Sequence, residues 1–87
     1  MLGAEQVRAY IMQGLACEYV AVQGADGQHF EAVVVSAQFA GKRMVQQHQL
    51  VYQALGGRMR DEIHALSLRT YTPEAWLAAG HQLTMEK

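Results

Sequence analysis

The spacing of apolar residues alternates between a helical and a strand period along this chain, and that order constrains the fold more than any other feature. Apolar residues recur every three to four positions over residues 5–17, which predicts an amphipathic helix. β-Branched and aromatic residues then concentrate in residues 18–23 and 29–36, which favours two strands. The Asp26-Gly27 step between them suits a tight turn, so these strands are expected to be antiparallel.

The second half of the chain repeats the change of period. Helical spacing resumes at residue 42 and is expected to run to residue 57 or one turn further. Residues 63–70 alternate as a half-buried strand does, and Thr72-Pro73-Glu74 is typical of a capped helix start. The predicted order is helix–strand–strand–helix–strand–helix. Two helices on one face of a three-stranded sheet make this an α+β two-layer domain.

The size of the chain and its cysteine content limit the classes of protein to consider. With 87 residues and 51% hydrophobic character, we expect one domain over residues 1–87, with an ordered core over about residues 5–79. No apolar run reaches the ~20 residues of a membrane span and no signal peptide is evident, so a cytoplasmic location is expected. The single cysteine, Cys17, excludes an internal disulfide and a Cys-x-x-Cys metal site.

Neither the motifs nor the overall charge indicates an enzyme. Catalytic triads, His-Glu-x-x-His sites and glycine-rich phosphate loops are absent, so we expect a non-enzymatic protein. The net charge is −1, yet residues 42–70 are basic. This region is either a solvated surface or a contact surface for DNA. Its basic residues are Lys42, Arg43, Arg58, Arg60 and Arg69.

Two stretches carry a family resemblance. They are residues 39–55, FAGKRMVQQHQLVYQAL, and residues 63–76, IHALSLRTYTPEAW. In order and spacing they resemble the BolA family, and the short turn over residues 24–30 resembles its IbaG (YrbA) branch most. The resemblance covers about residues 5–78 and implies the order of elements given above, in a fold akin to a type II KH domain.

The resemblance also implies a function. Members of the family are expected to partner a monothiol glutaredoxin, with a [2Fe-2S] cluster shared between the glutaredoxin cysteine, its bound glutathione and two residues of the BolA-like chain. Imidazole ligands in place of thiolates raise the reduction potential of such a cluster. The implied role is iron-sulfur trafficking or iron sensing, and the isolated chain is expected to be a cluster-free monomer or weak dimer. The alternative is a DNA-binding regulator of stress or envelope genes.

Three residues are candidate cluster ligands. His64 corresponds to the ligating histidine of the family, whereas its position alone favours a structural strand histidine. The second ligand is left open. Asp26 stands where one branch has cysteine but also suits a turn, and His29 is the nearest imidazole but also suits an exposed strand end.

Three further residues receive no functional role. Cys17 is expected to be a small buried side chain without an activated thiol. His48 borders the apolar side of the second helix and is expected to be structural, and His81 falls in the C-terminal tail.

Overall fold

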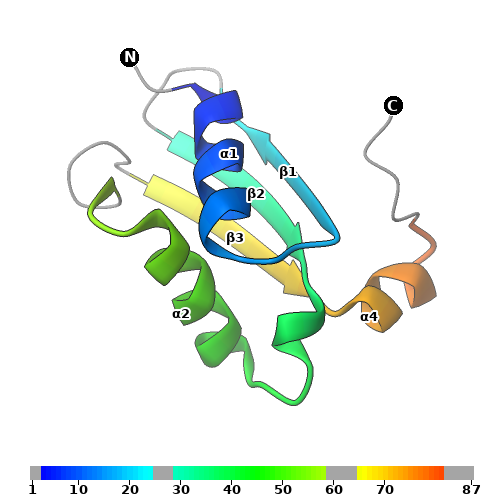
Figure 1. The fold of residues 1–87 in the computed structure, drawn as a ribbon. Coiled ribbons are helices and arrows are strands. Elements are labelled where there is room, and N and C mark those ends of the chain that lie inside the picture. The colour runs from blue at the N-terminus through cyan, green and yellow to red at the C-terminus, as the bar shows by residue number, and fades with distance from the viewer. Residues whose placement is uncertain (1–2, 25–28, 59–64, 82–87) are drawn as a thin grey trace.

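A three-stranded mixed sheet with two long helices on one face forms the framework of the molecule (Figure 1). The structure, a computed structural model, describes residues 3–24, 29–58 and 65–81. In chain order the elements are α1 (Ala4–Gly14), β1 (Tyr19–Gln23), β2 (His29–Val35), the 3-10 turn η1 (Ala37–Phe39), α2 (Met44–Leu55), β3 (Ala65–Tyr71) and α4 (Pro73–Ala78). This order confirms the predicted α+β class. None of the described helices is long and apolar enough to span a bilayer.

The strand order is β1-β2-β3, and the two pairings differ in direction. β1 pairs antiparallel to β2, as the turn signal predicts, while β2 pairs parallel to β3. A parallel neighbour requires a crossover connection, which η1 and α2 provide on one face of the sheet. Gln47 of α2 fastens this crossover, because its Nε2 donates to the carbonyl oxygens of Phe39 and Lys42 while its Oε1 accepts from the Thr70 hydroxyl of β3.

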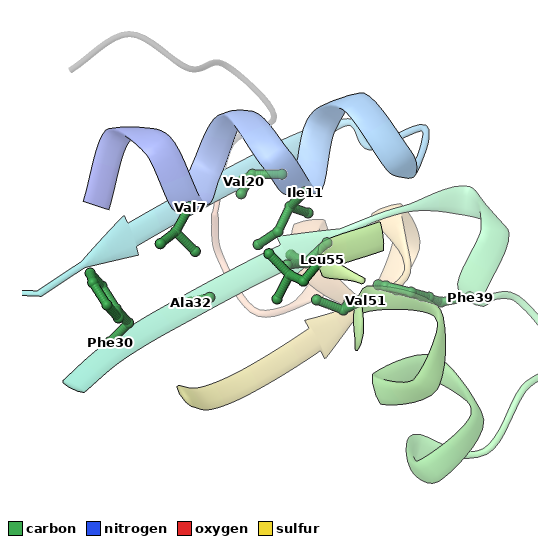
Figure 2. Close-up of a cluster of buried hydrophobic side chains, with 9 residues drawn as sticks. Val7, Ile11, Val20, Phe30, Ala32, Phe39, Val51 and Leu55 are labelled. Carbon is green, nitrogen blue, oxygen red and sulfur yellow. The ribbon is translucent and has the colours of Figure 1, made fainter. Parts of the chain in front are cut away.

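The hydrophobic core lies between α1, α2 and one face of the sheet. Alternate residues of β2 point toward the helices, as expected for a strand with one buried face. Figure 2 shows how side chains from both helices and from the sheet converge there. The members of this cluster, all 2% exposed or less, are Val7, Ile11, Val20, Phe30, Ala32, Val34, Phe39, Val51 and Leu55.

The helices differ from their predicted bounds by one turn or less. α1 ends at Gly14 because Leu15 has an extended backbone, so the expected continuation to residue 17 is wrong. α2 begins at Met44, where the side chain of Gln46 accepts from the Arg43 amide at 2.9 Å. It ends before Gly56, whose φ of 60° favours glycine.

The start of α4 matches its prediction. The Thr72 side chain accepts a hydrogen bond from the amide of Ala75 at 3.1 Å, and Pro73 occupies the first helical position. Both features favour a helix start, so α4 is specified locally by its sequence.

α4 covers one end of the second face of the sheet, which the sequence analysis does not anticipate. The pairing register puts Tyr19, Val35 and Tyr71 in one row across the strands. The Trp76 ring stacks on Tyr19 at 5.2 Å and meets Tyr71 edge-on at 5.0 Å between ring centroids. His81 in turn stacks on Trp76 at 3.9 Å, so residue 81 belongs to this aromatic cluster.

Gly14 marks the close approach of α1 to α2. A Cβ at this position would lie 2.7 Å from the Cα and 2.8 Å from the Cβ of Ala54, distances that force the helices apart. This contact explains a glycine within an otherwise regular helical pattern.

We expect Gly14→Ala to lower the free energy of unfolding by about 1–3 kcal/mol, because overpacking at the helix crossing outweighs the gain in helix propensity. The measurement is urea denaturation followed by circular dichroism. Gln13→Ala, on an exposed position of the same helix, is the control and should stay within ~0.5 kcal/mol of the parent. A more stable Gly14→Ala protein would contradict the close approach.

Candidate functional site

The parallel pairing of β2 with β3 brings the beginnings of these two strands together. His29 and Ala65, the first residue of each strand, are register partners. Asp26 and His64 lie outside the described residues, and in the chain they stand three residues before His29 and one before Ala65. The first residues of β2 and β3, which adjoin Asp26 and His64 in the chain, therefore lie side by side at one end of the sheet (Figure 1).

His29 is the predicted ligand that the structure describes. Its side chain is exposed at the first position of β2, and its register partner Ala65 is also exposed and presents only a methyl group. The next residue, Phe30, is 2% exposed and anchors this end of β2 in the core. A Cβ on Gly24, the residue after β1, would clash with Cδ1 of Phe30, so the chain leaving β1 also packs closely on this ring. The imidazole thus projects from a well-anchored strand end.

One candidate donor at this end, His29, can be compared with what a cluster shared with a partner requires. Within residues 3–24, 29–58 and 65–81 no group of three or more His, Cys, Asp or Glu side chains forms a metal site. A cluster held jointly with a partner asks this chain for two ligands only, and imidazole ligates iron in [2Fe-2S] centres. The exposed imidazole of His29 is compatible with that requirement.

Cys17 is at the opposite end of the sheet. It precedes β1, whose first residue Tyr19 pairs with the last residue of β2, Val35. The Cys17 thiol is half-buried and donates to the carbonyl oxygen of Leu15 at 3.2 Å. Burial, with a smaller contribution from the Glu18 charge, raises the pKa of the Cys17 thiol to about 11. This residue is therefore an inert thiol, as predicted.

Among the basic residues that the structure describes, Arg58 lies apart from Lys42 and Arg43, at the other end of α2. Lys42 and Arg43 are exposed just before α2, and Arg69 is exposed on β3. Arg58 lies beyond the other end of α2, where its guanidinium carbon sits 3.8 Å from the centre of the Tyr10 ring. Its Nη1 also donates to the carbonyl oxygen of Leu55 at 3.4 Å. Arg58 thus has a structural role, and Arg60 lies outside the described residues.

Comparison with known proteins gives a consistent picture. The family model described as BolA-like protein matches residues 15–75. Protein BOLA2 of Arabidopsis thaliana is 40% identical over 80 residues, which cover 87% of this chain and 85% of the relative. Acid stress protein IbaG of Escherichia coli is 36% identical over 72 residues, covering 82% and 84%. A BolA homologue from Coxiella burnetii superposes with a TM-score of 0.76 at 43% identity, covering 85% of this chain and 95% of that structure.

Another relative matches a shorter region of the chain. The DNA-binding transcriptional regulator BolA of Haemophilus influenzae is 50% identical over 50 residues, covering 58% of this chain. The match spans 48% of that regulator, so the chain corresponds to about half of its length. Similar relatives thus fall in the BolA, BOLA2 and IbaG branches, and the expected preference for the IbaG branch is not supported.

We expect the Cys17 thiol to react about 100-fold more slowly with iodoacetamide at pH 8.5 in the folded chain than in urea, because its pKa is raised by about two pH units from 9.0. A folded pKa above the unfolded value gives stability that is present below pH 9 and lost as the pH rises toward 11. Mass spectrometry of timed samples measures the rate. Equal rates in the folded and unfolded chain would contradict the burial of the thiol.

Proposed function

The chain belongs to the BolA family, and on that premise we propose that it is an adaptor of a monothiol glutaredoxin that contributes two ligands to a shared [2Fe-2S] cluster. BolA proteins are not enzymes, so the proposed activity is binding. The register between His29 and Ala65 is the observation that carries the proposal. It supports a ligand pair because both candidate segments lead into the same end of the sheet.

His64 is the first proposed ligand. It matches the ligating histidine of the family motif and is one peptide bond from Ala65, where β3 begins. An imidazole ligand must be neutral and held in one orientation, and attachment to a paired strand restricts the backbone that carries it. His29 or Asp26 supplies the second ligand, and of these His29 has the donor atom that better suits a [2Fe-2S] cluster.

In this proposal the cluster supplies the redox chemistry and the chain supplies ligands and their placement. The cluster, when bound, supplies a one-electron centre whose potential rises as imidazole replaces thiolate. The chain itself would bind and orient the cluster, because the paired first residues of β2 and β3 adjoin the proposed ligands in the chain and Phe30 anchors the start of β2 in the core. Because glutaredoxin and its glutathione provide the thiolates, Cys17 is not needed as a ligand.

DNA binding is the second candidate function. The exposed Lys42 and Arg43 lie together at the start of α2, and neither has an ion pair with another described residue. The relative from Haemophilus influenzae is named a DNA-binding transcriptional regulator, which supports this surface as a candidate DNA contact. So few phosphate contacts would give weak binding with a strong dependence on salt.

We expect His64→Ala to abolish the visible absorption of the shared cluster when the chain, a monothiol glutaredoxin, glutathione, iron and sulfide are combined anaerobically. Removal of an imidazole donor leaves the cluster one ligand short, while docking without the cluster should survive. Absorption spectra report the cluster, and isothermal titration with the apo-glutaredoxin reports docking.

Matched variants make this test specific. His81→Ala removes an imidazole that stacks on Trp76, next to Tyr19 and Tyr71 at the end of the sheet opposite His29. This variant should leave the cluster spectrum unchanged. His29→Ala and Asp26→Ala, made separately, identify the second ligand by which of them alters the spectrum. A His64→Ala protein that assembles a cluster with the parent spectrum and lifetime would overturn the proposal.

For the DNA candidate, we expect Lys42→Gln combined with Arg43→Gln to weaken binding to all duplexes and to reduce the slope of log affinity against log salt by roughly two. Fluorescence anisotropy at several salt concentrations measures both quantities. Arg58→Gln is the comparison, because its guanidinium is engaged with Tyr10 and Leu55 and should change the slope little. An unaltered slope in the double variant would remove the start of α2 as a DNA contact.

A further inference from the structure

β3 is an edge strand with an unusually open outer side. The order β1-β2-β3 leaves that side without a strand neighbour in the part of the chain that the structure describes. Proteins commonly protect such edges with proline, several charges or a covering element. β3 has seven residues, no proline and one charged residue, Arg69. Its outer backbone groups therefore form a template for another strand.

α2, which borders a groove with β3, exposes several large apolar side chains. Met44 and Val45 are each 67% exposed and Tyr52 is 38% exposed, so α2 carries three of the five large hydrophobic residues that the described chain exposes. His48 lies one helical turn from Met44 and one from Tyr52. Its ring is edge-on to that of Tyr52, at 6.4 Å between ring centroids. Met44 and His48 also line a groove of about 370 Å³ with residues 68–71 of β3.

The third feature is an unpaired set of charges on the open face of the sheet. Glu31 and Arg69 are both exposed there, and neither forms an ion pair with another described residue. Ser67 is the register partner of Glu31, and Val33 is that of Arg69. The small Ser67 side chain therefore lies between Glu31 and the outer edge of β3. The long cationic side chain of Arg69 lies on the same strand, two residues further along.

We propose that this surface pairs with a second copy of the chain, β3 against β3, in an antiparallel and twofold symmetric arrangement centred on Leu68. In this register Arg69 lies opposite Ser67 of the second copy, on the same face of the joined sheet. The arginine then reaches across the serine to Glu31 of the second copy. Twofold symmetry forms this ion pair twice.

Charge selects this register over its neighbours. An axis at Arg69 sets the two Arg69 side chains against each other, which is unfavourable. An axis at Ser67 places Arg69 opposite Ala65, whose register partner on β2 is His29, and leaves Glu31 unpaired. The axis at Leu68 satisfies both charges. It also brings the sides of the two α2 helices that carry Met44 and His48 toward each other over the joined edge.

The size of the interface sets the expected affinity. Seven strand residues extend about 23 Å, and with one side of α2 they form a contact of the small, transient class. We therefore expect a reversible dimer that dissociates in the micromolar range.

Charge reversal tests the proposal by sedimentation velocity over a wide range of chain concentration. Glu31→Arg and Arg69→Glu should each raise the dissociation constant at least tenfold, since each sets like charges together twice. The double variant, Glu31→Arg with Arg69→Glu, should recover self-association because it rebuilds both ion pairs in reverse. An equimolar mixture of the two single variants should form a heterodimer for the same reason.

Three further variants distinguish this interface from a general effect of charge or of exposed apolar surface. Glu5→Arg makes the same charge change on an exposed position of α1 and should leave the dissociation constant unchanged. Met44→Asp should weaken the dimer, and Leu77→Asp, at an apolar residue of α4 that is 52% exposed, should not. The proposal would be overturned by a parent chain that stays monomeric at every concentration. It would also be overturned if Glu31→Arg and Arg69→Glu each kept the parent's self-association and their mixture formed no heterodimer.

Discussion

The parallel pairing of β2 with β3 is the constraint on which the rest of this molecule depends. Parallel neighbours require a crossover, so η1 and α2 must pass over one face of the sheet and close the core above β2. Gln47 holds this crossover through hydrogen bonds to η1, to the loop before α2 and to β3. The same pairing places His29 beside Ala65, the residue that follows His64 in the chain.

Much of the fold is predictable from the sequence because each element signals itself locally. The helical spacing marks α1 and α2, the concentration of β-branched residues marks β1 and β2, and Thr72-Pro73 marks the start of α4. Long-range features are less predictable from periodicity. The direction of β3 relative to β2, the packing of Trp76 on the second face and the contact of Gly14 with Ala54 all depend on residues far apart in the chain.

The candidate site shows the same division. The family motif predicts His64 as a ligand, which stays a prediction, and the strand pattern places His29 at the first residue of β2, where the structure has it. The choice between His29 and Asp26 stays a prediction, because it depends on how a turn presents its side chains and not on local propensity. Arg58 illustrates the limit of charge counting, since its place in the sequence does not reveal that it packs on Tyr10.

The central claim is that this chain provides an imidazole nitrogen to a cluster shared with glutaredoxin, and pulsed electron paramagnetic resonance tests it most directly. The chain is labelled with ¹⁵N-histidine, combined with unlabelled monothiol glutaredoxin and glutathione, and the assembled cluster is reduced by one electron. The account predicts hyperfine coupling of the cluster to ¹⁵N, with the coupling lost in the unlabelled complex. A reduced cluster that shows no ¹⁵N coupling would contradict ligation by any histidine of this chain.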